Sequence, residues 1–254
     1  MRLVDGAEAI RGDLPVAATV TVDIPRGAGS NEGTSVRRLS SLQSVRDAQL
    51  TALANVHGLP ITIGGDCGVE LAAIQHADAR NDAMAVIWLD AHPDLNTPES
   101  SPSDAFTGMV LRTLLGEGTP TLVPQKPLAP SRTILAGIRN VDDGENDYLD
   151  SSAVRAIDVG DVGTESIVEA LTASGATSVY IHIDLDVLDP SEFDGVGDPM
   201  PFGLSLAVLI EVITAAKATL PLVGAGIAGF APASQDAAAD DLGSILRIIG
   251  ALAS

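Results

Sequence analysis

The feature that most constrains the fold of this chain is a regular alternation between two kinds of apolar segment. Short runs rich in β-branched residues predict strands at Pro60–Ile63, Ala83–Leu89, Thr133–Ile138, Val154–Val159, Ser178–Ile183 and Leu222–Phe230. Segments with helical periodicity lie between them, at Val36–Val56, Val69–His76, Val110–Leu115, Glu165–Ala173 and Leu206–Ala218. Because apolar strands that alternate with helices are covered on both faces, we predict a three-layer αβα fold with a mostly parallel central sheet.

The rest of the chain extends this pattern without dividing it. A further helix is predicted in the tail, where Leu242, Ile245, Leu246 and Ile249 fall on one helical stripe. No internal repeat or long linker separates the segments, and 254 residues are enough to bury one core. We therefore expect a single domain over residues 1–254.

The charge and the cysteine content limit the partners and the compartment. With 34 acidic against 14 basic residues, the formal charge of -20 repels phosphate backbones and anionic lipids but attracts cations and metal ions. We therefore expect a small-molecule substrate and a homo-oligomer, with neither nucleic acid nor a membrane as partner. Cys67 is the single cysteine, and the N-terminus has no apolar signal core, so we expect a reducing compartment, the cytoplasm.

Three clusters of polar residues each follow directly on a predicted strand. They are Gly64–Cys67, Asp90–Asp94 and Asp184–Asp186. In parallel sheets, ligands bind outside the carboxyl ends of the strands, so the three clusters should converge on one edge of the sheet.

The residue types in these clusters predict a metal site. Asp90, His92 and Asp94 alternate at one strand end, and Asp184 and Asp186 alternate at another. Buried charges of this kind are costly unless they are paired or bind a cation. Carboxylates with one imidazole suit Mn²⁺, Mg²⁺ or Zn²⁺, and paired aspartates indicate two ions about 3.5–4 Å apart that activate a shared water.

The flanking residues make a family resemblance specific. Val86–Pro98, which contains Asp90-Ala91-His92-Pro93-Asp94, resembles the DAHxD motif of the arginase/agmatinase/formiminoglutamase (ureohydrolase) family, and Asp184–Pro190 resembles its DxDxxDP motif. Gly64-Gly65-Asp66-Cys67 stands where the family has GGDH. The resemblance implies an arginase-like fold and two Mn²⁺ ions bridged by Asp90 and Asp184. His92 and Asp186 would complete one ion site, and Asp94 and Cys67 the other.

The resemblance also implies a reaction, in which a metal-bound hydroxide hydrolyses a C–N bond of an amidine or amide. Three positions depart from the family. Cys67 replaces a histidine ligand and either favours Zn²⁺ at a weakened site or merely fills space. Thr107 occupies the place of a proton-handling histidine, and Gly229 that of a glutamate that pairs with guanidinium. We therefore expect no activity on arginine or agmatine.

Other interpretations stay open at this point. Asp90, His92, Asp184 and Asp186 form one complete site, which would suit a single-Zn²⁺ deacetylase-like hydrolase. A non-catalytic binding or scaffold protein of the same fold is the third hypothesis. His182 points to the same face of its strand as Asp184, so it could donate to a ligand carboxylate, carry a proton in place of Thr107, or be a core histidine.

Two further features are tied to the chain's ends. Family members usually begin with an additional strand, which is either absent here or precedes Met1. Near the other end, Gly224–Gly229 fits the GxGxxG pattern of dinucleotide-binding folds. Pro232 interrupts the helix that such a site needs, so we do not interpret it as a nucleotide site.

Overall fold

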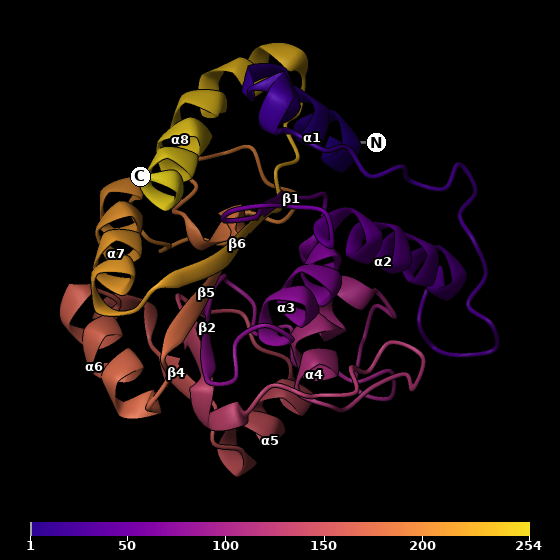
Figure 1. Ribbon diagram of the computed structural model, residues 1–254, viewed down its shortest axis with the longest axis horizontal. Helices are drawn as coiled ribbons and strands as arrows, with labels where there is room; N and C mark the ends of the chain where they lie inside the picture. The colour runs from indigo at the N-terminus through magenta and orange to yellow at the C-terminus, as the bar shows by residue number, and fades with distance from the viewer. Residues whose placement is uncertain (1) are drawn as a thin grey trace.

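Six parallel strands form one sheet in the computed structural model, which describes residues 2–254 (Figure 1). They are β1 (Ile61–Ile63), β2 (Met84–Leu89), β3 (Thr133–Ala136), β4 (Arg155–Ile157), β5 (Ser178–Asp184) and β6 (Leu222–Ala228), in the spatial order β1-β6-β5-β2-β3-β4. Every pairing among them is parallel. Each strand falls where the sequence predicts one, which confirms the α/β class.

Helices cover both faces of the sheet, as Figure 1 shows. One layer contains α2 (Leu39–Leu53), α3 (Glu70–Asp78), α4 (Val110–Leu114) and α5 (Asp143–Ser151), and the other contains α6 (Thr164–Ser174), α7 (Leu206–Thr219) and α8 (Gln235–Ala253). Helix α1 (Arg2–Asp13) packs against α8. The predicted three-layer arrangement is therefore confirmed.

Strand β2 shows why the central strands are continuous apolar runs. Ala85, Ile87 and Leu89 belong to the core on the α6–α8 face, whereas Met84, Val86 and Trp88 belong to the core on the α2–α4 face. Successive side chains of a strand point to opposite faces, and here both faces are covered, so every residue of β2 is buried.

Some predicted boundaries are wrong by a few residues, for backbone reasons. Strands β3 and β6 end earlier than predicted because Gly137 and Gly229 follow them with φ of +95° and +87°, outside the β region. Helix α2 begins only after Arg38, whose φ is 61°. In α8 the buried stripe runs through Ile245, Ile248 and Leu252, while Leu246 is 38% exposed.

The order of the strands creates one place where the chain direction reverses. After β2 the chain continues outward to β3, and after β5 it continues in the opposite direction to β6, although β2 and β5 are neighbours. At such a switch point the connecting loops separate and leave a crevice at the carboxyl ends of the strands. The fold therefore predicts a binding site directly after Leu89 and Ile183.

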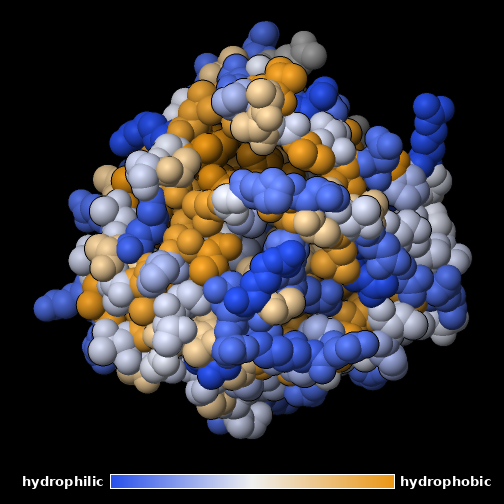
Figure 2. Space-filling model, in the orientation of Figure 1, coloured by the Kyte–Doolittle hydropathy of each residue, from blue (hydrophilic) through white to orange (hydrophobic). Residues whose placement is uncertain are grey.

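The surface seen in Figure 2 is divided in character. Apolar residues gather between α1, α7 and α8, whereas the surface over α2 and the loop beside it is hydrophilic to neutral. Within residues 2–254, none of the helices combines the length and the apolar character that crossing a membrane requires.

Candidate metal centre

Asp90 and Asp184 lie side by side at the switch point. Leu89 of β2 is in register with Ile183 of β5, so the next residue of each strand is an aspartate at the same edge. Asp90 Oδ1 accepts a hydrogen bond from the backbone N–H of His92 (2.7 Å), and Asp184 Oδ1 accepts one from that of Asp186 (2.9 Å). These turns hold both carboxylates, which are buried, at the floor of the site.

One group of donors, which we call the His92 side, consists of Asp90 Oδ1, His92 and Asp186. His92 Nδ1 lies 2.9 Å from Asp186 Oδ2 and 3.5 Å from Asp90 Oδ1. Asp186 Oδ1 accepts a hydrogen bond from the N–H of Ala91 at 3.0 Å. The Asn140 side-chain amide lies 3.0 Å from His92 Nε2 and fixes the ring from its open side.

A second group, the Cys67 side, consists of Asp90 Oδ2, Cys67, Asp184 and Asp94. Cys67 Sγ lies 3.0 Å from Asp184 Oδ2 and 3.7 Å from Asp90 Oδ2. Cys67 opens a short 3-10 helix, Cys67–Val69, whose first turn is capped by the Asp66 carboxylate. The indole N–H of Trp88 donates to Asp90 Oδ2 at 3.2 Å, so the shared carboxylate is fixed from below.

Asp94 reaches the Cys67 side through an unusual backbone conformation. Its φ is +52°, in the left-handed region that residues other than glycine rarely adopt. The side chain is buried, interacts with Cys67, and leaves Oδ2 without a hydrogen-bond partner within the described part of the chain. Local strain and an unpaired buried oxygen are both features that cluster at functional sites.

Burial is the largest cause of the pKa shifts in this centre, and the proximity of like charges adds to it. Burial, together with the neighbouring aspartates, raises the pKa of Asp94, Asp184 and Asp186. Burial and the same carboxylates also raise the pKa of the Cys67 thiol. Burial lowers the pKa of His92, but its contacts with Asp186 and Asp90 outweigh this and raise it to about 11. A cation is therefore strongly favoured at this centre.

A cavity of about 390 Å³ opens above these groups. It is lined by Cys67, Asp90, His92, Asp94, Asp184 and Asp186, and also by Leu3, Asp66, Thr107, Asn140, Asp142, Glu145, Asp198 and Gly229 among others. The structure thus brings all six sequence-predicted metal ligands to one cavity. None of the described residues that line it is a lysine or an arginine.

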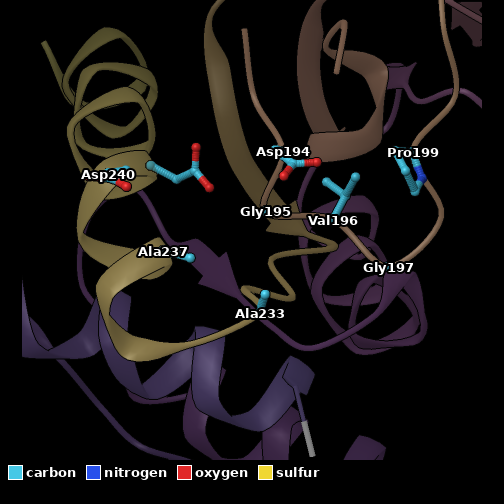
Figure 3. A pocket seen from close by; sticks show the side chains of 9 residues that line it. Asp194, Gly195, Val196, Gly197, Pro199, Ala233, Ala237 and Asp240 are labelled. Atoms are coloured by element: carbon cyan, nitrogen blue, oxygen red, sulfur yellow. The ribbon is translucent and has the colours of Figure 1, made fainter. Parts of the chain in front are cut away.

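A smaller cavity of about 290 Å³ adjoins the first, and Val196 and Gly197 line both. Figure 3 shows Asp240 of α8 across from Asp194 and the loop that follows it. That loop is fixed to the end of β6, because Gly195 O accepts a hydrogen bond from the N–H of Ala231. The loop therefore forms a defined wall of the metal centre and presents Asp198 to the cavity.

Comparison with known proteins places this geometry in a family. The family model described as "Arginase family" matches residues 8–246. The chain belongs to the arginase family. The arginase of Entamoeba histolytica is 35% identical over 186 residues, which cover 68% of this chain and 63% of that protein. The arginase of Staphylococcus aureus is 29% identical over 207 residues, which cover 77% of this chain and 67% of that protein.

The fold agrees with a solved structure of the same arginase family. The crystal structure of Entamoeba histolytica arginase in complex with L-ornithine superposes with a TM-score of 0.88 at 25% identity, and covers 99% of this chain and 92% of that one. The arginase-like fold that the motifs implied is therefore confirmed. One further structure with this fold is named as the proclavaminate amidino hydrolase of Streptomyces clavuligerus, with a TM-score of 0.62 at 24% identity over 85% of this chain and 71% of that one.

Within this arginase-family site, the three departures occupy defined places. Thr107 lies in a short 3-10 helix, Phe106–Met109, and lines the cavity. Cys67 lies among the carboxylates, as described above. At Gly229, a Cβ would lie 2.2 Å from Asp184 Oδ1, and φ is +87°. Position 229 therefore excludes any side chain, including the glutamate that the family resemblance implies there, unless Asp184 and the backbone both move.

His182 lies beneath the cavity and not in its wall. Its ring is fully buried below Asp90, stacks on Trp88 at 3.7 Å between centroids, and is not among the described residues that line the cavity. Its neighbour Glu70, also fully buried, was missed by sequence reasoning; the available signal was a glutamate followed directly by four apolar residues at the start of a helix.

Proposed function

We propose that this chain is a divalent-metal-dependent hydrolase of a C–N bond in an amidine or amide, and that it holds two ions. The observation that carries the proposal is the position of Asp90. Its Oδ1 faces the His92 side, at 3.5 Å from His92 Nδ1, while its Oδ2 faces the Cys67 side, at 3.7 Å from Cys67 Sγ. A carboxylate with a separate donor group at each oxygen is the arrangement that a pair of ions requires.

The donor set fits such ions chemically. Asp90, Asp94, Asp184 and Asp186 are all buried within one centre, and Asp94 Oδ2 has no hydrogen-bond partner in the described residues. Buried carboxylates at this density repel one another unless cations separate them. The oxygen and imidazole donors suit Mn²⁺, and the thiol of Cys67 suits Zn²⁺.

The chain's own residues then divide the remaining tasks. The bound ions would supply the charge that activates a water molecule for attack. Asn140 orients His92, and Trp88 orients Asp90, through the hydrogen bonds described above. The Thr107 hydroxyl lies at the cavity wall. It can donate or accept a hydrogen bond but cannot act as a general acid near neutral pH.

The substrate that we propose is a small molecule other than arginine or agmatine. Gly229 supplies no carboxylate to pair with guanidinium, and its conformation leaves no room for one. A cavity without a described lysine or arginine also provides no partner for an anionic substrate. A neutral or singly charged amidine or amide matches both properties.

A screen of substrates combined with metal analysis tests this proposal. Protein purified without chelator should contain two ions and should release ammonia or an amine from at least one amidine or amide in a panel that includes arginine and agmatine. The Asp184→Asn variant serves as the inactive control. Hydrolysis of arginine at a rate typical of the named arginases would refute the substrate proposal while supporting the reaction class.

The two other hypotheses correspond to different outcomes of the same measurement. The His92 side alone offers a complete donor group, Asp90, His92 and Asp186, so a single ion with retained hydrolysis would identify a one-metal hydrolase. Protein that binds no ion under any condition would instead indicate a non-catalytic member of the family.

A further inference from the structure

The His182 ring has no hydrogen bond at either nitrogen within the described part of the chain, although it is fully buried. Nδ1 faces the Glu70 carboxylate at 3.4 Å, so Nε2 is the nitrogen that lacks a close partner, and a buried polar atom in this state normally marks a missing partner. Nε2 points toward Asp90 Oδ2 at 3.7 Å, a separation too long for a hydrogen bond. Something between the two atoms would satisfy both.

Cys67 Sγ faces the same oxygen from another direction. It also lies 3.7 Å from Asp90 Oδ2, and single donor atoms of Cys67, Asp90 and His182 lie within 4.8 Å of one another. Two ligands of one tetrahedral Zn²⁺ ion are about 3.3–3.8 Å apart, given bond lengths of about 2.0–2.3 Å. The two distances from Asp90 Oδ2, to Cys67 Sγ and to His182 Nε2, fit ligands of one ion, and Asp184 Oδ2, 3.0 Å from Cys67 Sγ, adds a fourth donor atom.

The other nitrogen of His182 has the environment of a metal-bound histidine. Nδ1 lies 3.4 Å from Glu70 Oε1, and Glu70 Oε2 accepts a hydrogen bond from the Tyr180 hydroxyl at 2.7 Å. Histidines that bind metals usually direct their second N–H to a carboxylate, which fixes the tautomer and the ring. Tyr180 in turn fixes that carboxylate.

Gly226 shows that space for this arrangement is built into the sheet. A Cβ at position 226 would lie 1.5 Å from Glu70 Oε1. Any residue with a side chain at this position of β6 would therefore displace Glu70 from His182. Glu70 of α3, Tyr180 of β5 and Gly226 of β6 thus combine to hold the His182 imidazole with Nε2 directed at the Cys67 side.

From this geometry we propose that His182 is a metal ligand and that the Cys67 side is a zinc site formed by Cys67, Asp90 and His182, with Asp184 as a further donor. In this site the imidazole comes from β5, because the position that follows β1 carries a thiol instead. The inference rests on the metal-binding part of the proposed function but not on the reaction. It makes the two sides unlike: one selects Zn²⁺, and the other retains the donor set of a Mn²⁺ site.

Cobalt substitution tests the ligands without any assay of activity. Wild-type protein loaded with Co²⁺ should show thiolate-to-cobalt charge-transfer absorption and the intense visible bands of a tetrahedral ion, and Cys67→Ser should remove the charge-transfer band. X-ray absorption of the Zn²⁺ form should give one sulfur at about 2.3 Å and nitrogen or oxygen ligands at about 2.0–2.1 Å.

Substitutions of His182 test whether it is a ligand, because they either lower the Zn²⁺ affinity or leave it unchanged or raised. His182→Asn should lower the Zn²⁺ affinity of this site about a hundredfold, and Glu70→Gln about tenfold, by competition with a chelating dye. His76→Asn, on α3 and outside the cavity, is the matched control and should change nothing. If the buried ring is instead an imidazolium that repels cations, His182→Asn will leave the affinity unchanged or raise it, which overturns the proposal.

A crystal structure of the wild-type protein with Zn²⁺ tests the proposal even if the variants fail to fold. An ion bound to the wild-type protein but not to His182 Nε2 overturns the proposal directly. Hydrolysis supported by two Mn²⁺ ions, with no effect of His182→Asn, would overturn this inference and leave the proposed function intact. Zinc bound through sulfur and His182 Nε2 in a protein without hydrolytic activity would support this inference and overturn the proposed function.

Discussion

The His92 side and the Cys67 side share Asp90 but differ in almost every other respect. His92 is partly exposed to the cavity, where Asn140 contacts its outer nitrogen. On the Cys67 side, the thiol and the neighbouring His182 are buried, and no nitrogen of that ring is hydrogen-bonded within residues 2–254. The His92 side therefore has the residues of the family motifs, whereas the Cys67 side has a thiol where the motif has a histidine.

The two sides of the proposed metal centre are built from different parts of the chain, so one could change without disturbing the other. The His92 side depends on short-range features, because Asp90, Ala91 and His92 come from one loop and Asp186 from the next strand end. The Cys67 side depends on groups from β1, β2 and β5 and on the helix that carries Glu70. A substitution there can be compensated by a residue from another segment.

Asp90→Asn should have the largest effect, because it removes the one carboxylate common to both sides. We expect the affinity for both ions to fall by at least about a hundredfold. The stabilisation that ions provide, about 3–4 kcal/mol at concentrations of 100 to 1,000 times Kd, should disappear with it. Calorimetric titration and thermal unfolding with and without Mn²⁺ measure the two quantities.

The exposed Asp198→Asn at the cavity wall is the matched control for Asp90→Asn. It should retain both ions. A variant Asp90→Asn that loses the ion on one side only would show that Asp90 is not shared.

Gly229→Ala should perturb the Cys67 side through Asp184. The left-handed backbone at φ +87° costs a residue with a Cβ about 1–3 kcal/mol, and contact with the Asp184 carboxylate adds to this. We expect lower stability in urea and weaker metal binding on the Cys67 side. Gly250→Ala, where a Cβ meets nothing within 4 Å, is the control and should stabilise α8 slightly. Unchanged metal binding in Gly229→Ala would show that Asp184 tolerates displacement.

Asn140→Ala should affect the His92 side alone. The loss of its contact with His92 Nε2 should weaken that ion about tenfold, at the low end of what such partners contribute, because the site is partly exposed. The cobalt charge-transfer band of the Cys67 side should not change. A change in that band would mean that the two sides are coupled more tightly than their separate donor groups suggest.

Cys67→His should produce the smallest change and make the two sides more alike. Imidazole is a better ligand for Mn²⁺ than a thiol, so Mn²⁺ affinity on the Cys67 side should rise about threefold to tenfold while preference for Zn²⁺ declines. Competition between the two ions, followed by metal analysis, measures the change. If Mn²⁺ affinity is unaltered, Cys67 fills space and is not a ligand.

Much of the fold follows from the sequence because burial on both faces leaves a clear signal in the central strands. All six strands were predicted, and so was the edge at which Asp90 and Asp184 meet. The strand ends were less predictable, since Gly137 and Gly229 adopt left-handed conformations that glycine permits but does not require. The predicted apolar stripe of α8 included Leu246, which is in fact exposed at the edge of the buried face.

The candidate site was predictable where its residues are close in sequence and not where they are distant. The alternation of Asp90, His92 and Asp94 along the sequence indicates that they are metal ligands. Their convergence with Asp184 and Asp186 follows from the parallel sheet. Glu70 and Gly226 could not be linked to His182, because that requires the side-chain packing of α3 against β5 and β6. The GxGxxG pattern of β6 has its explanation here: Gly226 makes room for Glu70, and Gly229 for Asp184.

The left-handed conformation of Gly229 also has an evolutionary consequence. A single codon change that restored a glutamate at this position would place its Cβ against Asp184 and damage the metal centre before any guanidinium could be bound. Under the proposed function, a chain with this backbone would need at least two coupled changes, at position 229 and at Asp184, to gain a glutamate there. New specificities are more accessible from the cavity wall, where residues such as Asp198 can vary without touching an ion ligand.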